Sequence, residues 1–478
     1  MANTIEEQIR ATGVAKVIAV VREGLPAGGG GAGLAAAVVG ASTTESVAAD
    51  LSRYFVLSPQ SQQVALAAVE STGRGGARRP REVPRVRVYP ALGLLLGTVE
   101  RDGLEQLRID SRIQAVHSAP PLSLVRPVRT ASASKPTKVT WGLDRLGIPA
   151  LWHHGFTGKG VLVGHLDTGV DGAHPALKGA IKHFAQFDLQ GDPVPGAKPS
   201  DSGEHGTHTA GTIVGRAVGR TAFGVAPGAQ LASAMVIEGG DVIARVLAGM
   251  DWVVSLGVRI LSMSLGIRGY TDDFLPLTRV LRARNILPVF AAGNEYAGLT
   301  RSPGNYAEAL SVGAVDSHDA VADFSSSGRF DRPNDPIVPD LAAPGVDVVS
   351  CTPGNHYAQM SGTSMATPHV AGLAAILMEA KPGATADEVE QAIFGSCALS
   401  AGMSPDRAGR GIPSGLNALQ RLTGGVVPAP RRIVSPRPPK RRSRPSRQRP
   451  AARRGAGVRR SSTARRSLPK RRSARKKR

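Results

Sequence analysis

The chain has 478 residues, enough for two or three domains, and a formal net charge of +22. That charge is concentrated at one end, because residues 431–478 contain 22 of the 59 Lys and Arg residues and no Asp or Glu, which leaves residues 1–430 with 37 groups of each sign. The distribution excludes a protein that is basic over its whole surface, and two cysteines are too few for a disulfide-rich scaffold or a cysteine zinc site.

The N-terminus has acidic residues, Glu6 and Glu7, where a secretory signal would have basic residues followed by an apolar run. The chain also has no stretch of about 18 apolar residues of the kind that spans a membrane. We therefore expect no membrane span. We favour a cytoplasmic protein, but atypical secretion stays open and the compartment is unknown.

Residues 1–125 form a small unit in which strand and helix patterns alternate. Residues 13–23 are typical of a β-strand, and four glycines at 28–31 lie in a Gly/Ala tract that we interpret as a flexible insertion. The remaining expected elements are a helix over 44–55, a strand over 92–99, a helix over 104–109 and a strand over 113–116. We interpret the unit as a small β-α-β-β-α-β fold, of which these segments locate three strands and both helices.

Residues 124–138 are rich in Ser, Thr, Pro, Arg and Lys, and few of their side chains can pack. This composition predicts an exposed linker at 126–140, which separates the first unit from a larger one at 141–425. The end of the chain, residues 426–478, has almost no apolar residue to bury and is expected to be disordered.

The larger unit alternates apolar runs with helical patterns. The runs have the character of buried strands and lie at 161–166, 231–237, 259–265, 287–292 and 310–315. Helical patterns fill two of the intervals, at 241–256 and 274–285. Such alternation predicts an α/β fold, with a mostly parallel sheet covered by helices on both faces and a small α+β unit before it.

Three polar motifs stand where strands of this sheet end or helices begin. Asp167 follows the run at 161–166, His205 opens the segment His205-Gly-Thr-His-Thr-Ala-Gly211, and Ser364 lies at the start of a helical pattern. A serine hydroxyl needs a histidine base to attack an amide, and the histidine needs a carboxylate to fix its tautomer. Asp167, His205 and Ser364 supply these three groups.

The order Asp, His, Ser along the chain is that of subtilisin, and residues 138–425 resemble the subtilisin family (subtilases, peptidase S8) of serine proteases. Further segments resemble the family in its own order: Gly224-Val-Ala-Pro-Gly-Ala229, Leu261-Ser-Met-Ser-Leu-Gly266, Ala291-Ala-Gly-Asn-Glu295 and Gly362-Thr-Ser-Met-Ala-Thr-Pro-His369. The resemblance implies a serine endopeptidase that hydrolyses peptide bonds of protein or peptide substrates through an acyl-enzyme, after processing itself.

The same resemblance assigns residues around the triad. Asn294 is the candidate donor to the oxyanion, with the backbone N–H of Ser364 as the second donor. The candidate substrate-binding walls are Ser264, Leu265 and Gly266 on one side and Ala291, Ala292 and Gly293 on the other. Because both walls contain small residues and no charge, we expect an open first pocket that prefers large apolar or unbranched side chains.

The resemblance also bears on cofactors and partners. The implied chemistry needs no cofactor, and we assign no metal ligand. Where the family has an Asn-rich calcium loop, this chain has residues 215–223 with arginines and apolar side chains, which are poor calcium ligands, so that site is expected to be absent while other structural calcium positions stay open. Residues 1–125 resemble a subtilase pro-domain, which implies a chaperone and inhibitor that is cleaved from the enzyme within 126–140.

Other interpretations compete with these assignments. Asp167 and Asp201, each in an Asp-x-Gly motif, could form an aspartic-protease pair, but such pairs take one carboxylate from each of two lobes. Glycines 28, 30 and 33 fit a dinucleotide motif, but residues 23–27 separate them from the strand. The motifs could also survive in an inactive protein, although no triad residue is substituted. We expect His165 in the core, on the opposite face of its strand from Asp167, and free thiols at both cysteines.

The basic residues of the tail are separated by prolines and serines and are accompanied by no aromatic residue. They can neutralise phosphates but have no means of reading bases. We expect non-specific contact with nucleic acid or another polyanion, against the alternative of a tail that only aids solubility.

Overall fold

The computed structural model describes residues 4–22, 34–57, 84–218, 223–237, 239–330 and 335–425. The basic tail and the glycines at 28–31 of the Gly/Ala tract lie outside these ranges, and so do the expectations made for them. Of the helices within the described ranges, none combines the length and the apolarity that crossing a lipid bilayer requires.

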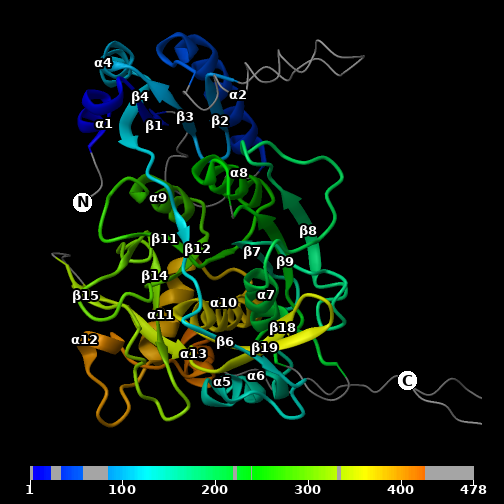
Figure 1. Cartoon of the computed structure of the whole chain (residues 1–478). Helices are drawn as coiled ribbons and strands as arrows, with labels where there is room; N and C mark the ends of the chain where they lie inside the picture. The colour runs from blue at the N-terminus through cyan, green and yellow to red at the C-terminus, as the bar shows by residue number, and fades with distance from the viewer. Residues whose placement is uncertain are drawn as a thin grey trace, which may run out of the picture. The chain divides into compact units, whose positions relative to one another are not determined.

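The larger unit is built on a sheet of 7 parallel strands in the order β17-β14-β12-β10-β7-β9-β8 (Figure 1). The strands are β7 (Leu162–Asp167), β8 (Ile181–Gln186), β9 (Gln230–Met235), β10 (Ile260–Met263), β12 (Leu287–Ala291), β14 (Leu310–Val315) and β17 (Leu341–Pro344). The predicted α/β class is confirmed. Each apolar run supplies a strand, because a strand covered on both faces must bury consecutive side chains. The run at 259–265 is divided, since Leu265 begins β11 (Leu265–Arg268) in another sheet.

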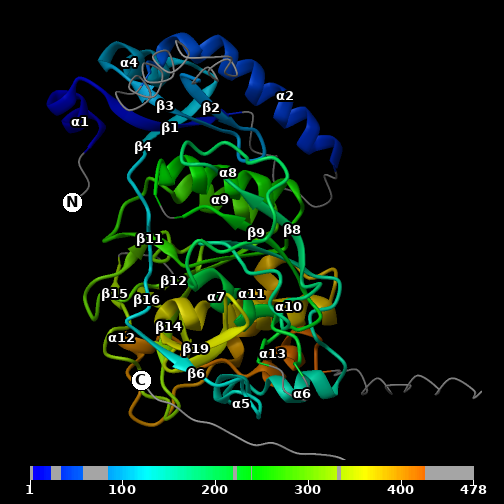
Figure 2. The ribbon, with the colours of Figure 1, turned by 45° about the vertical axis from the view of Figure 1, so that its right-hand side comes forward.

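Helices cover both faces of this sheet, as Figure 1 and Figure 2 show. One face carries α8 (Val242–Ser255) and α9 (Leu275–Ala283), and the other carries α7 (His205–Val214), α10 (Thr363–Ala380) and α11 (Ala386–Ser396). Neighbouring residues of a strand enter opposite cores: Leu261 packs with α8 and α9, whereas Ile260 packs with α7 and α10.

The N-terminal unit has an antiparallel sheet of its own, in the order β2-β3-β1-β4. Its elements are α1 (Ile5–Thr12), β1 (Ala15–Val21), α2 (Leu34–Leu51), a 3-10 turn (Ser52–Tyr54), β2 (Val86–Tyr89), β3 (Leu94–Val99), α4 (Arg101–Ile109) and β4 (Ile113–Ser118). The small α+β unit is confirmed. The helix expected at 44–55 instead spans 34–51, because the Ala-rich residues before Thr44 favour a helix. Helix α1 was missed, although Thr4 and Glu7 form a capping box at its start.

The two sides of the N-terminal sheet serve different cores. Val17 and Leu95 pack in a core formed within the unit, whereas Ile18, Leu94 and Leu96 share a core with α8 and α9. Polar contacts also join the N-terminal unit to the larger unit. Three are hydrogen bonds: Tyr89 Oη donates to Ala244 O (3.1 Å), Leu92 N to Asp251 Oδ1 (3.0 Å) and Ser118 N to Asp273 Oδ1 (3.0 Å). Two are ion pairs, between Arg87 and Asp192 (2.7 Å) and between Lys16 and Asp241.

Most residues of the linker expected at 126–140 are exposed, as predicted, but strand pairing that was not expected holds the segment after β4 along the larger unit. β5 (Ser123–Leu124) pairs antiparallel with β11, and β6 (Arg129–Ala133) pairs antiparallel with β19 (His356–Ser361), a path that the cyan chain follows in Figure 1 and Figure 2. Val125, between the two strands, is only 1% exposed. The composition did not reveal this because backbone hydrogen bonds, which any sequence can form, hold the segment to two sheet edges.

The remaining elements complete the larger unit. They are α5 (Trp141–Arg145), α6 (Ile148–His153), β13 (Arg301–Ser302), β15 (Gly328–Arg329), β16 (Ile337–Val338), β18 (Val348–Thr352), α12 (Pro405–Ala408) and α13 (Gly415–Leu422). β13 is the edge of a three-stranded sheet, β13-β11-β5, that becomes important at the candidate site.

Candidate active site

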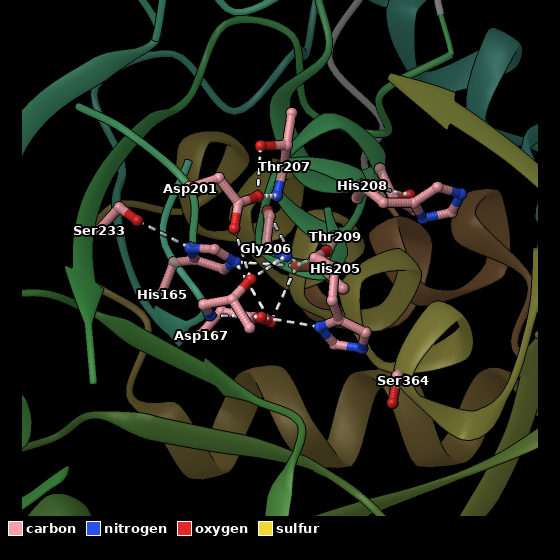
Figure 3. Close-up of polar contacts among 12 residues, drawn as sticks. His165, Asp167, Asp201, His205, Gly206, Thr207, His208, Thr209, Ser233 and Ser364 are labelled. Atoms are coloured by element: carbon pink, nitrogen blue, oxygen red, sulfur yellow. Dashed lines mark hydrogen bonds and ion pairs between the residues drawn. The ribbon is translucent and has the colours of Figure 1, made fainter. Parts of the chain in front are cut away.

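Asp167 and His205 meet at the end of the parallel sheet. Asp167 is the last residue of β7 and His205 the first residue of α7, and the Nδ1 atom of His205 lies 2.7 Å from the Oδ1 atom of Asp167 (Figure 3). Both side chains are buried. The Thr168 N–H also donates to Oδ1, at 2.7 Å, and the Thr209 hydroxyl to Oδ2, at 3.1 Å. These contacts fix the carboxylate and the imidazole in one orientation.

The protonation of this pair follows from its surroundings. Burial raises the pKa of Asp167, but the neighbouring His205 and the Thr168 N–H outweigh burial and hold that pKa below its usual value. An ionised carboxylate accepts a hydrogen bond from Nδ1–H, so Nδ1 keeps its proton and Nε2 is the basic nitrogen. The Nε2 atom has no hydrogen-bond partner within the described part of the chain. It is therefore available to take a proton from another group.

Ser364 is the second residue of α10 and is fully buried. Its hydroxyl donates to the carbonyl oxygen of Val125, and Figure 3 draws no contact between Ser364 and the His205 ring. The structure therefore places the serine against the chain's own segment. Its hydroxyl must rotate before its proton can pass to Nε2 of His205.

The segment Ser123–Arg126 occupies the site as an extended strand. Leu124 pairs with Leu265 and Ser123 with Gly266, and the Val125 N–H donates to the carbonyl of Ser264 at 2.9 Å. The candidate wall Ser264-Leu265-Gly266 is thus bonded to the chain itself, in the backbone pattern that a substrate would use.

Asn294 lies on the other side of the segment. Its Nδ2 atom donates to the carbonyl of Arg126 at 2.8 Å, and its Oδ1 atom accepts the Thr363 N–H at 2.9 Å and the Thr363 hydroxyl at 2.9 Å. Because Thr363 holds the Oδ1 atom, the Nδ2 atom of the amide points at the segment. In this state the amide binds the carbonyl one residue beyond Val125.

The second candidate wall, Ala291-Ala292-Gly293, continues from the end of β12 and is buried around the two alanines. A buried ion pair between Glu295 and Arg301 lies next to this wall, although the wall segment itself carries no charge. The expected preference for large apolar or unbranched side chains stays a prediction. A Cβ atom added to Gly293 would lie 2.4 Å from the Glu295 carboxylate and 3.2 Å from the Arg301 side chain. Sequence reasoning missed this buried ion pair, because Arg301 stands outside every motif and only the pairing of β13 with β11 brings it to the site.

His165 lies behind the triad and not on the far face of the strand. Its Nε2 atom is 2.9 Å from Thr209 Oγ1 and 3.7 Å from Asp167 Oδ2, and its Nδ1 atom is 2.9 Å from Ser233 Oγ (Figure 3). The expected burial of His165 is confirmed. The expected opposite face was wrong, because residues two apart in a strand share a face. Burial lowers the pKa of His165, which favours a neutral ring beside the Asp167 carboxylate.

Asp201, which an aspartic-protease pair would need, has another role in the structure. Asp201 accepts the Thr168 hydroxyl (2.7 Å), the Thr207 N–H (2.7 Å) and the Thr207 hydroxyl (2.6 Å), so it holds the start of α7. Cys351 and Cys397 are free.

Potential metal ligands gather at one place in the described ranges, at His117, Asp272 and Asp273. The carboxylate of Asp273 already accepts the Ser118 N–H at 3.0 Å and the Thr271 hydroxyl. Residues 219–222, within the segment where a calcium loop was expected to be absent, lie outside the described ranges. The expectation about calcium stays a prediction.

Comparisons with known proteins agree with this geometry. A sequence model of the Subtilase family (Peptidase_S8) matches residues 158–414, which include Asp167, His205, Asn294 and Ser364. The chain is 38% identical to subtilisin Savinase of Lederbergia lenta over 247 residues, which are 51% of this chain and 86% of that protein. It is also 38% identical to M-protease of Shouchella clausii over 247 residues, which are 51% of this chain but only 60% of that protein. It is 31% identical to the subtilisin-like protease PopC of Myxococcus xanthus over 371 residues, which are 68% of this chain and 76% of that protein.

Proposed function

Because the chain belongs to the subtilase family of serine proteases, we propose that it is an endopeptidase that forms an acyl-enzyme on Ser364 and that first cleaves its own Val125–Arg126 bond. Its substrates are proteins and peptides that bind as an extended strand along Ser264-Leu265-Gly266.

The roles of the residues follow from their positions. His205 takes the Ser364 proton at Nε2 as the hydroxyl attacks a carbonyl carbon, and then gives that proton to the leaving amine. Water then attacks the acyl carbon, and His205 takes a proton from the water and returns it to the Ser364 oxygen as the ester bond breaks. Asp167 orients the imidazole and stabilises its charged form. Asn294 and the Ser364 N–H donate to the oxyanion, where preorganised donors contribute most.

One observation carries this proposal: the Val125 carbonyl accepts a hydrogen bond from the Ser364 hydroxyl while the residues before it pair with β11. A strand in this register presents the bond after Val125 to the nucleophile. Cleavage there would divide the chain at the start of the expected linker, with residues 1–125 as pro-domain and Arg126 as the first residue of a remaining chain of residues 126–478.

The contacts of the N-terminal unit support an inhibitory role for it. The unit packs on α8 and α9, and the segment that leaves its β4 fills the strand position of a substrate. After cleavage, residues 123–125 would keep their backbone contacts with β11 as a bound product. The pro-domain would then block the site until it dissociates or is degraded.

Two measurements on purified full-length protein test the proposal. A serine-directed fluorophosphonate should label Ser364 in the matured enzyme, and the mass and N-terminal sequence of that enzyme should show that it begins at Arg126. The Ser364→Ala variant should stay a single chain of full mass and take no label. Active wild-type enzyme that remains uncut would refute self-processing, and matured protein without a label on Ser364 would refute the acyl-enzyme.

We propose further that no cofactor enters the chemistry, since every step uses side chains and backbone groups named above. A chelator should therefore act only through stability, and a fall in kcat at unchanged folded fraction would contradict this. The tail at 431–478, with 22 basic residues, would add non-specific contact with polyanions. Truncation after Pro430 should abolish heparin retention and leave cleavage of a neutral peptide unchanged.

A further inference from the structure

Arg301 lies between the two walls of the candidate site. Its backbone N–H donates to the carbonyl of Ala292 at 3.0 Å, and its Nη1 atom donates to the carbonyl of Gly266 at 3.2 Å. The side chain is 11% exposed. A buried guanidinium thus connects the wall that pairs with the bound segment to the wall that follows β12.

The same Nη1 atom also contacts the bound segment, at a side chain and not at the backbone. It donates to the Oγ atom of Ser123 at 2.8 Å, and that hydroxyl lies 3.3 Å from the carbonyl of Gly266, to which it donates. Ser123 is the third residue before the proposed cleaved bond. Its hydroxyl is therefore used both as an acceptor and as a donor, and a methyl group in its place would do neither.

Glu295 holds the guanidinium in this position. Its Oε1 atom accepts the Arg301 Nε–H at 2.8 Å and lies 2.6 Å from Nη2, and the exposed fraction of the Glu295 side chain is 4%. Its Oε2 atom accepts the N–H of Asn294 at 2.9 Å. Two of the three guanidinium nitrogens are thus bound to Glu295, which leaves Nη1 directed at Gly266 and Ser123. A charged donor in a fixed position discriminates between side chains better than a flexible one does.

We infer that Arg301 is a specificity-determining residue, which recognises a hydroxyl group on the third residue before the cleaved bond. This inference rests on the proposed function and on the register of the bound segment. Serine fits both hydrogen bonds, and threonine offers the same hydroxyl. With alanine at this position, Nη1 would lose the hydroxyl acceptor and keep only the carbonyl of Gly266. Lysine would place a second positive charge next to a guanidinium that is already buried.

The test uses full-length protein that has been left to mature, with peptides of the sequence leucine-X-leucine-valine-arginine-proline, which copies the bound segment. X is serine, threonine, alanine or lysine, and kcat/KM is measured for each peptide at the valine-arginine bond. The loss of one hydrogen bond to a charged group should lower kcat/KM about tenfold to hundredfold from serine to alanine. Lysine should be worse than alanine. Equal values for serine, alanine and lysine would overturn the inference.

Two variants locate the effect. Arg301→Met should bring the serine-to-alanine ratio close to one, whatever its absolute activity. Arg268→Met is the matched control, because Arg268 also reaches Glu295, at 3.4 Å, but is 73% exposed and makes no hydrogen bond to Ser123 within the described part of the chain. It should keep the wild-type ratio. A ratio that survives Arg301→Met, or that is lost in Arg268→Met, would assign the recognition elsewhere.

The outcomes separate this inference from the proposed function. If the wild type cleaves no peptide and Ser364 takes no fluorophosphonate, the protease proposal fails and the inference fails with it. If the wild type is active and labelled but shows no preference at X, only the inference fails. Should Arg301→Met not fold, the wild-type peptide series still decides between these outcomes.

Discussion

The N-terminal sheet and the seven-stranded sheet are stabilised in different ways. The larger sheet is covered by helices on both faces, and its cores hold the residues next to the triad. The N-terminal sheet keeps one core to itself, around Val17 and Leu95, while its other side rests on α8 and α9 with a few polar contacts. All candidate catalytic groups come from the larger unit, and the smaller unit contributes only the segment bound at the site. In the proposed function, the larger unit would therefore perform the chemistry and the smaller unit would supply the first segment bound at its site.

The largest difference between the two units is expected from a cavity in the core that the N-terminal unit keeps to itself. Leu95 is fully buried in the core that the N-terminal unit keeps to itself, so Leu95→Ala should destabilise the precursor by about 2–5 kcal/mol. Chemical unfolding of the Ser364→Ala precursor would measure this. Enzyme that still matures should have wild-type kcat, because Leu95 leaves with residues 1–125.

The matched variant lies in the larger unit. Leu377 of α10 is equally buried, and Leu377→Ala should lower the stability of both precursor and mature enzyme. The comparison of the two units would break down if Leu95→Ala changed the kcat of the mature enzyme or if Leu377→Ala spared its stability.

The oxyanion assignment predicts the next largest effect. Asn294→Ala should lower kcat about 10²–10³-fold and leave KM nearly unchanged, since the lost donor acts mainly in the transition state. Self-processing should slow in parallel. Thermal unfolding provides the control, because Asn294 also accepts hydrogen bonds from Thr363. A variant whose lost activity tracks its lost folded fraction would point to a structural role for Asn294.

A carboxylate at the interface between the units predicts a pH effect. Burial raises the pKa of Asp251 from 3.8 to about 6, although the Leu92 N–H partly offsets this. Because the pKa in the folded protein is the higher one, the contribution of Asp251 to stability is fully present below pH 3.8 and is lost as the pH rises through about 6.

Asp251→Asn removes that titration but keeps an acceptor for Leu92. The double variant Ser364→Ala/Asp251→Asn should therefore become more stable to heat, relative to the Ser364→Ala precursor alone, as the pH rises from about 4 to about 7. Glu105→Gln, which removes an exposed carboxylate from α4, is the control and should show no such trend. A constant difference between Asp251→Asn and its parent at all pH values would contradict the prediction.

The smallest effect is expected from the ion pair between Arg87 and Asp192, whose side chains are 17% and 23% exposed. A partly exposed pair of this kind contributes about 0–1 kcal/mol and is screened by salt. Arg87→Ala should shift the unfolding midpoint of the precursor slightly at low salt and less at high salt. A large shift that ignores salt would mean that the side chain stabilises the interface by packing.

The strands of the larger unit could be predicted from the sequence because buried parallel strands are continuous apolar runs, as at Leu310–Val315. Asp167, His205 and Ser364 could be selected because each stands at the end or the start of such an element, and the structure brings the first two within hydrogen-bonding distance. Their catalytic roles remain predictions.

The contacts that could not be predicted depend on pairing between segments that are far apart in the sequence. Ser123 and Arg301 are 178 positions apart and meet only because both flank β11. The order of residues 123–133 was missed for the same reason, since hydrogen bonds to β11 and β19 leave no trace in composition. Helix α2 was placed too late because an Ala-rich run beside glycines was interpreted as part of an insertion.

The pairing of β6 with β19 would also govern whether self-cleavage can be undone. The N–H of Val128 donates to the carbonyl of Ser361 at 2.8 Å, three residues before Ser364, and five residue pairs continue the ladder from Arg129. After cleavage, this ladder would keep the amine of Arg126 close to the acyl group on Ser364, at a high effective concentration. The amine would then compete with water and reseal the bond. Separation of β6 from β19 would remove this amine from the site and so favour hydrolysis of the acyl group over resealing.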